Sequence, residues 1–515
     1  MTVQLTGNDL SFEQLYEVSL HGAEASLAAE ARDRMLASRA VIETIVGAQT
    51  TAYGVNTGFG DLAEVRISTD QIRTLQVNLV RSHACGVGAP LAEPETRAII
   101  LLRANALAKG LSGVRPAIVE SLCALLSHRV HPVIPSQGSV GASGDLAPLA
   151  HLALALIGEG QALFHGQRLA GGEALRKAGL SPLVLEAKEG ISLLNGTQGM
   201  LALLALALRE SQILTTTADV AAALSLDALR GSPAAFDPRI AAARPYPGHA
   251  VTSRHLLRLN RGSQIRESHR PTDRDRRVQD AYSLRCTPQV HGAVRDAVAA
   301  VRTIAEIELN SATDNPLVFA ATDGVAGSGD VISGGNFHGQ PLAMAADQLA
   351  VALATLGGIC ERRIEHMTNP HTSLLPAFLT SSPGLNSGFM IAQVTAAALA
   401  SENKALAAPH SVDSIPTSGG QEDYVSMGMS SARRLQPMLD NLRRIVAIEL
   451  LAACQGIDFL APLKTGGEAM KAHDLVREVS AHVEADRSLA GDIEAVAARI
   501  AEKAFSDILI EVATR

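Results

Sequence analysis

Five long stretches rich in alanine and leucine limit the folds open to this chain. They are residues 200–229, 288–310, 341–367, 384–408 and 430–459. Each is about twice as long as the average helix of about 11–12 residues. Aromatic residues make up only 3% of the chain and tryptophan is absent, so the core must consist of small aliphatic side chains, which suit closely packed helices. The sequence therefore predicts an all-α fold, with a long central helical bundle over residues 199–515 and a smaller, mixed N-terminal domain over residues 1–198.

The charge of the chain argues against nucleic acid as a partner. The 44 lysine and arginine residues and the 52 aspartate and glutamate residues give a net charge of −8, which is typical of an ordinary protein surface. Residues 255–279 are rich in arginine, but acidic residues are mixed with the arginines and aromatic side chains do not alternate with them. This segment is therefore predicted to be a solvated, mobile loop.

The cysteines and the apolar runs predict a soluble, cytoplasmic protein without a membrane partner. Five cysteines lie far apart and form no Cys-x-x-Cys pair, which favours reduced, buried thiols over disulfides or a zinc site. Residues 1–14 are polar and mixed in character, unlike a signal peptide. The apolar run 200–208 meets Arg209 and Glu210 well before the roughly 20 residues that a membrane span needs.

The segment 138–151, Gly-Ser-Val-Gly-Ala-Ser-Gly-Asp-Leu-Ala-Pro-Leu-Ala-His, places four small residues between two apolar stretches. One interpretation is a helix-capping loop, in which Ser143 or Asp145 accepts hydrogen bonds from the first N–H groups of a helix that starts near residue 146. The other interpretation is chemical. The unhindered nitrogen of Gly144 attacks the carbonyl of Ala142, loss of water closes a five-membered ring, and dehydration of Ser143 leaves an electrophilic methylidene. The residues alone are compatible with both.

Further polar loops have roles that the residues alone leave open. Tyr53 lies in the glycine-rich sequence Ala-Tyr-Gly-Val-Asn-Thr-Gly-Phe-Gly, which suits either a turn or a mobile lid that delivers a catalytic group. His83 ends a predicted helix, where a histidine is usually a cap or a surface residue. Asn195 belongs to an Asn-Gly pair, which is normally a turn. Asp314 and Asn315 could belong to a metal site, but no histidine lies at ligand spacing, so none is predicted.

Taken together, these segments resemble the aromatic amino-acid ammonia-lyases. The resemblance runs from about Tyr53 to Gly456 through the ordered motifs Tyr-Gly-Val-Asn-Thr-Gly-Phe-Gly, Ala-Ser-Gly, Leu-Leu-Asn-Gly-Thr, Tyr-Ser-Leu-Arg-Cys and Gln-Glu-Asp. It implies an ammonia-lyase and fumarase-like helical fold, and a homotetramer whose active sites combine residues from several chains. It also implies a 4-methylideneimidazole-5-one (MIO) group, which forms autocatalytically from Ala142, Ser143 and Gly144 and needs no external cofactor.

The resemblance implies a role for each residue that matches a family motif. Tyr53 would be the general base, and a phenol, with an unperturbed pKa of about 10, must be partly ionised to take a proton at neutral pH. Arg285 would bind the substrate carboxylate through its guanidinium fork. Gln279 and Tyr282 would flank the site, and Tyr282 would be a further catalytic group. Asn195 would lie against the MIO ring and the substrate. The other implied substrate contacts are His83, Phe337 and Glu422.

Three residues bear on the identity of the substrate. His83 follows a serine, as in the histidine-acting members of the family, although its side chain could also bind a phenol. Glu422 stands where members acting on phenylalanine or tyrosine commonly have glutamine, and a carboxylate favours the charged or N–H-donating form of an imidazole. Tyr424 departs from the histidine-type pattern Gln-Glu-Asp-His and could mark a phenolic substrate.

The resemblance therefore implies a carbon–nitrogen lyase that converts L-histidine to trans-urocanate and ammonia, the first step of histidine degradation to glutamate. A tyrosine or phenylalanine ammonia-lyase and a 2,3-aminomutase are alternatives within the same chemistry. An inactive helical scaffold, or a lyase of the fumarase-like fold without a modified backbone, is an alternative from another class.

Overall fold

A computed structural model describes residues 2–48, 52, 54–55, 57, 67–68, 71–270, 277–322 and 325–510 of the chain. The chain forms two compact units, each assembled from three segments. The first unit comprises Met1–Leu206, Arg302–Asp347 and Pro409–Arg433, and the second comprises Ala207–Val301, Gln348–Ala408 and Arg434–Arg515. Helices predominate and the strands are short, so the predicted helical fold with a mixed N-terminal part is confirmed.

The strands lie in the first unit, where they form four small sheets among the described residues. They are β1 (Thr2–Leu5), β2 (Glu24–Leu27), β3 (Val87–Pro90), β4 (Val130–Pro132), β5 (Pro135–Gln137), β6 (Gln161–Phe164), β7 (Gln167–Ala170), β8 (Leu317–Ala320) and β9 (Gly329–Ile332). β1 and β2 pair in parallel, and the other pairs are antiparallel. β6 and β7 form a hairpin, in which His165 and Gly166 both have positive φ, as a two-residue turn requires. β1 and β2 were not predicted from the sequence, because four residues are too few for a strand period to stand out.

Helix α4 (Glu93–Ala108) forms the centre of the first unit's core. Its residues 96–108 are all buried, including the side chains of Arg97 and Arg103. Arg103 donates a hydrogen bond to the carbonyl oxygen of Asn195 at 2.8 Å, which joins the core helix to a predicted site residue. The other helices of this unit are α1 (Phe12–His21), α2 (Ala29–Gly47), α3 (Ile72–His83), α5 (Pro116–Ser127), α6 (Leu146–Leu156), α7 (Gly171–Lys177), α8 (Glu189–Leu194), η5 (Ser418–Gly420) and α17 (Gly428–Arg433).

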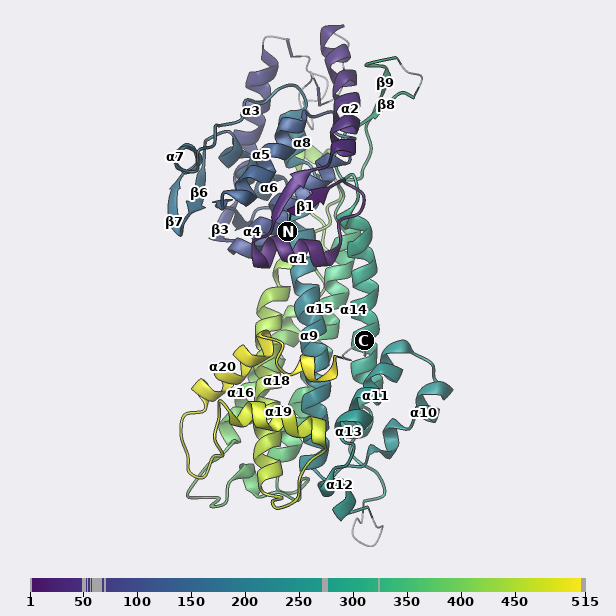
Figure 1. The fold of residues 1–515 in the computed structure, drawn as a ribbon, viewed down its shortest axis with the longest axis vertical. Coiled ribbons are helices and arrows are strands. Elements are labelled where there is room, and N and C mark those ends of the chain that lie inside the picture. The colour runs from purple at the N-terminus through teal and green to yellow at the C-terminus, as the bar shows by residue number, and fades with distance from the viewer. Residues whose placement is uncertain are drawn as a thin grey trace. The chain divides into compact units, whose positions relative to one another are not determined.

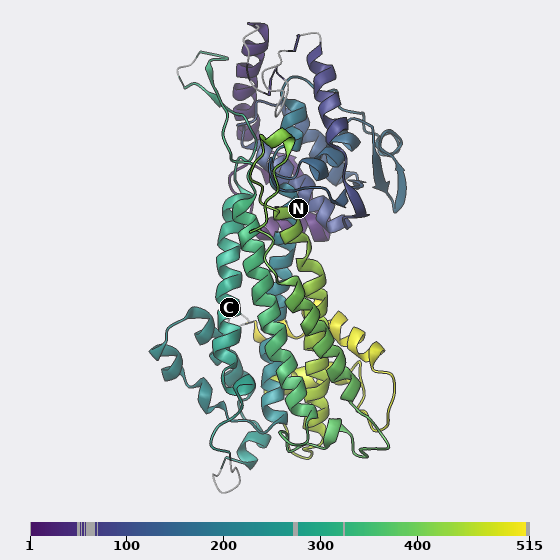
Figure 2. The same cartoon turned by 180° about the vertical axis from the view of Figure 1, so that it is seen from behind.

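Long helices that lie side by side build the second unit (Figures 1 and 2). Three of them, α9 (Gln198–Ala228), α14 (Thr287–Leu309) and α15 (Gln340–Thr368), contribute residues to both units. The others are α16 (Met390–Leu406) and α18 (Leu435–Asp458), which pack along each other. All five predicted long stretches are therefore helical, although the last is divided between α17 and α18.

Shorter helices complete the second unit. They are η3 (Pro233–Phe236), α10 (Pro238–Ala243), α11 (Pro247–Leu259), α12 (Gln264–Ser268), α13 (Tyr282–Arg285), η4 (Ala377–Leu379), α19 (Gly467–Arg477), α20 (Ala490–Ala501) and η6 (Ser506–Leu509). Among the described helices, α15 alone has the length and apolarity of a membrane span. Of its most apolar window, 61% is buried inside the protein, as in the core helix of a bundle.

The structure corrects the prediction that residues 255–279 form one mobile loop. Helix α11 continues to Leu259, and α12 covers part of the remainder. The side chains of Leu256, Leu259 and Ile265 are buried and hold these helices against the unit. The segment has more charged residues than buried apolar ones, so its charge pattern alone wrongly predicted a loop.

The cysteines only partly match the prediction of buried, reduced thiols. All five are free thiols, and Cys123, Cys360 and Cys454 are buried. Cys85 is exposed because it lies just beyond the last residue of α3, and Cys286 is half-buried.

The first unit is not the contiguous stretch of residues 1–198 that the sequence predicted. Two later segments, residues 302–347 and 409–433, also belong to it. The buried Nζ of Lys188 lies 2.7 Å from Oδ2 of Asp314, and the amide of Met427 donates to the carbonyl oxygen of Val140 at 2.8 Å. These contacts bring polar loops from distant parts of the sequence to one place.

Candidate active site

A cavity of about 590 Å³ lies in the first unit at the Ala-Ser-Gly segment. This volume is in the range of small-molecule sites, about 300–1,000 Å³. Six of the predicted site residues line it: His83, Ala142, Ser143, Asn195, Phe337 and Glu422. Their positions in the sequence span more than 300 residues, so the fold of the unit is what brings them together.

The Ala-Ser-Gly segment adopts a turn that only its glycines allow. Gly141 and Gly144 have φ of +69° and +73°, in the left-handed region that other residues avoid. A Cβ on Gly144 would collide with the carbonyl of Gly196, and a Cβ on Gly141 would collide with Oγ of Ser426. The amide of Asp145 donates to the carbonyl oxygen of Gly196 at 2.7 Å, which fixes the end of the turn.

Helix α6 begins at Leu146, where the sequence predicted a helix, but the predicted side-chain cap is absent. Oδ2 of Asp145 instead accepts a hydrogen bond from the amide of Met200 in the first turn of α9, at 2.7 Å. Oδ1 of Asp145 accepts from Oγ of Ser139 at 2.9 Å. Burial raises the pKa of Asp145 to about 6, although these hydrogen bonds oppose the shift. The carboxyl group therefore connects the turn to α9.

The hydroxyl of Ser143 contacts the predicted substrate-binding carboxylate directly. Oγ of Ser143 donates to Oε1 of Glu422 at 3.2 Å. Oε2 of Glu422 accepts from Oγ1 of Thr417 at 2.8 Å, and the backbones of Thr417 and Glu422 pair across a short antiparallel bridge. Because both oxygens have donors, the carboxylate is held in a fixed orientation beside Ser143.

Asn195 offers an unused hydrogen-bond acceptor to this cavity. The residue is 2% exposed, and its Nδ2 donates to the carbonyl oxygen of Asn315 at 3.2 Å. Its Oδ1 is buried and has no hydrogen-bond partner. A buried acceptor without a donor costs about 1–3 kcal/mol, so it favours a ligand or group that brings a donor. The free Oδ1 and the glycine turn together fit an MIO group built at residues 142–144.

The ring of His83 is oriented by its own helix. Its Nδ1 lies 2.9 Å from the carbonyl oxygen of Leu79, one turn earlier in α3. A carbonyl oxygen only accepts, so Nδ1 carries the hydrogen, and Nε2 of the neutral ring is an acceptor. His83 can therefore receive a hydrogen bond from an imidazole N–H or from a phenol.

His338 and Tyr424 also line the cavity, and sequence reasoning gave His338 no role. Nε2 of His338 lies 3.2 Å from the carbonyl oxygen of Tyr424, and Nδ1 accepts from the amide of Gln340 at 3.3 Å. The two rings stack with centroids 6.1 Å apart. Thus the backbone of Tyr424, and not its hydroxyl, holds His338. The available signal was the position of His338 next to Phe337 in a polar loop.

Five predicted site residues are not among those lining this cavity. One of them, Gly144, still belongs to the Ala-Ser-Gly turn beside it. Tyr53 lies outside the described residues. Gln279, Tyr282 and Arg285 belong to the second unit, whereas the lining residues all belong to the first. The guanidinium of Arg285 lies over the ring of Tyr282, 4.5 Å from its centroid, and its buried Nε has no hydrogen-bond partner. In the described part of the chain, no group of three or more His, Cys, Asp or Glu side chains is arranged to hold a metal ion.

Comparison with known proteins identifies the family. Residues 10–478 match a family model described as aromatic amino acid lyase. The chain belongs to the aromatic amino acid lyase family. It is 55% identical over 505 residues to a histidine ammonia-lyase of Koribacter versatilis strain Ellin345, and the match covers 97% of each protein.

Solved structures support the same placement within the aromatic amino acid lyases. The crystal structure of histidine ammonia-lyase from Trypanosoma cruzi is 44% identical, with a TM-score of 0.90, and the match covers 99% of this chain and 95% of that one. A tyrosine aminomutase from Streptomyces globisporus is 39% identical, with a TM-score of 0.92 and coverage of 99% and 98%. These matches confirm the predicted resemblance, the helical fold and the class of carbon–nitrogen lyase.

Proposed function

We propose that this chain is a histidine ammonia-lyase, which removes ammonia from L-histidine and releases trans-urocanate. One observation carries the proposal. Within one cavity, the Ser143 hydroxyl of the Ala-Ser-Gly turn contacts Glu422, the residue expected to distinguish an imidazole from a benzene ring. The 55% identity to a histidine ammonia-lyase supports the same substrate.

Residues 142–144 fit the MIO group of this chemistry. Gly144 leaves the backbone nitrogen unhindered, and Ser143 supplies the hydroxyl that dehydration removes. When formed, the group supplies an electrophile for the amine of the substrate. Asn195, with its free Oδ1, would hold the substrate against it.

The side chains of this chain then bind the substrate and move one proton. The guanidinium of Arg285 binds the carboxylate, with Gln279 and Tyr282 beside it. In the charged form of the substrate imidazole both ring nitrogens donate, one N–H to Glu422 and the other to Nε2 of His83. Tyr53 removes a proton from the β-carbon, the electron pair forms the carbon–carbon double bond, and ammonia leaves. Phe337, a cavity-lining side chain, would help to keep water from the reacting atoms.

We further propose that the enzyme is a cytoplasmic homotetramer with shared active sites. The cavity around Ser143 is lined by the first unit alone, while Arg285, Tyr282 and Gln279 belong to the second. Arg285 also has a buried Nε without a partner. A neighbouring chain that supplied these three residues would complete the site.

A second candidate is an aminomutase, which would return ammonia to the neighbouring carbon. The 39% identity to a tyrosine aminomutase and the tyrosine at position 424 favour it. The product distinguishes the two. A lyase releases urocanate and ammonia in equal amounts, and an aminomutase yields a β-amino acid.

Two measurements on Ser143 test the proposal. Mass spectrometry of the peptide that contains residues 142–144 should find it lighter than its sequence by two water molecules. Ser143→Ala should lower the rate of urocanate formation by on the order of a thousandfold or more, because the electrophile is lost. Ser127→Ala, at the exposed serine that ends α5, is the control and should retain full activity. Full activity in the Ser143→Ala protein would refute the mechanism.

A further inference from the structure

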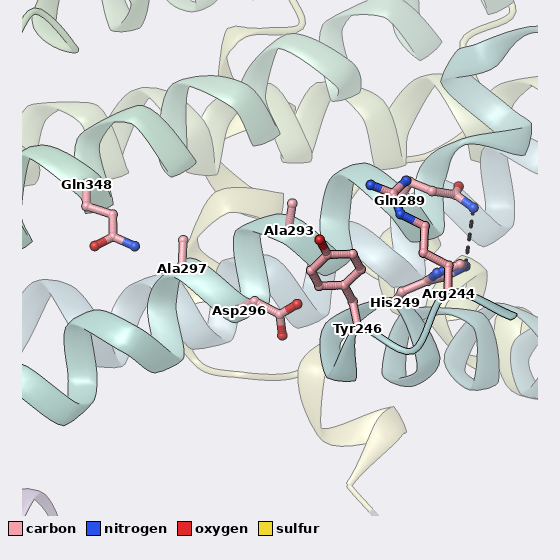
Figure 3. Close-up of a pocket in the computed structure, with 8 residues that line it drawn as sticks. All are labelled: Arg244, Tyr246, His249, Gln289, Ala293, Asp296, Ala297 and Gln348. Atoms are coloured by element: carbon pink, nitrogen blue, oxygen red, sulfur yellow. Dashed lines mark hydrogen bonds between the residues drawn. The ribbon is translucent and has the colours of Figure 1, made fainter. Parts of the chain in front are cut away.

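A second cavity, of about 440 Å³, lies in the second unit (Figure 3). Its polar side chains include Arg244 and Tyr246, which lie between α10 and α11, and Asp296 and Gln289 on α14. The proposed deamination uses none of these residues. The cavity combines one carboxylate and one guanidinium, and each of them has unused hydrogen-bonding capacity.

Only one of the two carboxylate oxygens of Asp296 has a hydrogen-bond partner. Its Oδ1 accepts a hydrogen bond from the amide of Gly248 at 2.8 Å, in the first turn of α11. A Cβ on Gly248 would collide with the carbonyl of Gly292 and would also approach Oδ1 of Asp296 to 2.9 Å, so glycine allows α11 to lie close to α14. Oδ2 of Asp296 is buried and has no hydrogen-bond partner. A buried, charged acceptor without a donor is costly, so the site favours a ligand that carries a cation.

Arg244 provides the opposite charge. Its guanidinium lies 5.2 Å from the centroid of the Tyr246 ring, and no carboxylate of the described residues forms an ion pair with it. In Figure 3 the ring of Tyr246 lies between the guanidinium of Arg244 and the carboxylate of Asp296. No ion pair joins these two described side chains, so each charge can pair with a group of a ligand.

Gln289 adds a second acceptor. Its Nε2 lies 3.2 Å from Nε2 of His249, and because the amide nitrogen only donates, this ring nitrogen is the acceptor. Oε1 of Gln289 is buried and has no hydrogen-bond partner. His249 is 3% exposed, so the hydrogen bond that fixes the side-chain amide of Gln289 comes from a buried ring.

We propose that this cavity binds a free α-amino acid in its zwitterionic form, at a site separate from the one that contains Ser143. The ammonium group would donate to Oδ2 of Asp296 and to Oε1 of Gln289, and the carboxylate would pair with Arg244. The carboxylate of Asp296 would repel a simple anion, and the guanidinium of Arg244 would repel a simple cation. A zwitterion satisfies both, and the ring of Tyr246 offers a surface for its carbon atoms.

The number of amino-acid molecules bound per chain tests this inference. Equilibrium dialysis with radiolabelled L-histidine uses the full-length Ser143→Ala protein, which prevents turnover. Asp296→Asn is then added to this protein, and Asp33→Asn, at an exposed aspartate of α2, is added separately as the control. At saturation we expect the Asp296→Asn protein to bind one molecule of L-histidine per chain fewer than the control. The asparagine keeps Oδ1 for the amide of Gly248, so the start of α11 is preserved. Arg244→Gln, on an exposed segment, should lose the same equivalent.

The outcomes separate this inference from the proposed function. If the proposed function is wrong and L-histidine does not bind beside Ser143, each chain would bind one molecule instead of two. Asp296→Asn would still abolish the binding of that one molecule. Equal binding in the Asp296→Asn, Arg244→Gln and Asp33→Asn proteins would overturn the inference.

Competition tests the requirement for both charges. Glycine should displace the label that Asp296→Asn removes, and acetate or methylammonium at the same concentration should not. Displacement by acetate alone would show a simple anion site and contradict the proposal.

Discussion

The hydroxyl of Ser143 and the carboxylate of Glu422 form the contact on which the proposed substrate depends. Oε1 of Glu422 receives a hydrogen bond from Ser143 in the free protein, and Thr417 holds Oε2. Dehydration of Ser143 would remove its hydroxyl and leave Oε1 free to accept from an imidazole N–H. The carboxylate is thus already oriented when the substrate enters.

Replacing this carboxylate by an amide should selectively impair the reaction of histidine. We expect Glu422→Gln to lower kcat/KM for L-histidine about tenfold to a hundredfold, because a hydrogen bond to a charged group contributes about 1.5–3 kcal/mol. Steady-state kinetics of urocanate formation measure the change. Glu484→Gln, at an exposed glutamate of the second unit, is the control and should match the unaltered protein. An equal rate in the Glu422→Gln and Glu484→Gln proteins would refute this role.

The sequence identified the cavity residues that belong to distinctive motifs and missed those that act through backbone groups. Ser143, Asn195 and Glu422 stand in specific motifs, and all three line the cavity. His338 is held by a backbone carbonyl oxygen and a backbone amide, which every residue type has, so the sequence did not indicate its position. The free Oδ1 of Asn195 depends on where the other chain segments lie, which a linear pattern does not contain.

At the scale of elements, the carboxyl of Asp145 connects the start of α6 to the start of α9. The capping interpretation predicted where α6 begins, with Ser143 or Asp145 as its cap, but Asp145 accepts from the amide of Met200 in α9 instead. The five long helices were predictable because each has many apolar positions. The short strands were not, because only pairing with a partner stabilises them.

Stability should depend on the protonation of Asp145. Its pKa in the folded protein is raised from 3.8 to about 6, so the folded state binds this proton more tightly than the unfolded chain does. The group therefore adds to the free energy of unfolding at low pH, and this contribution is lost as the pH rises through about 6. Between pH 7 and pH 5 the gain on acidification is about 1 kcal/mol.

Asp145→Asn should remove that part of the pH dependence. Urea denaturation at the two pH values measures the free energy of unfolding, and Asp33→Asn serves as the control that keeps the dependence. If the Asp145→Asn protein gained as much stability on acidification as the control, the carboxyl would not be the group responsible.

At the scale of the whole molecule, the proposal requires that different chains complete one another's sites. Ser143 and Arg285 belong to different units of the chain, and each is expected to be indispensable. Co-expression of Ser143→Ala with Arg285→Ala chains should restore activity that neither has alone. With random assembly, about one site in four would contain both intact residues.

A matched pair of variants gives the control for co-expression. Ser143 and Glu422 line the cavity of a single chain, so Ser143→Ala mixed with Glu422→Ala should restore nothing beyond the activity of Glu422→Ala alone. Equal results for the two mixtures would contradict shared sites.

The most direct test of the account is a comparison of substrates. The purified protein is incubated separately with L-histidine, L-tyrosine and L-phenylalanine while the near-ultraviolet absorbance is followed. We expect the urocanate band to grow with L-histidine alone, which would make Tyr424 a tolerated variation. A coumarate band with L-tyrosine, without urocanate from L-histidine, would contradict it and would make His83 and Tyr424 a pair that binds a phenol.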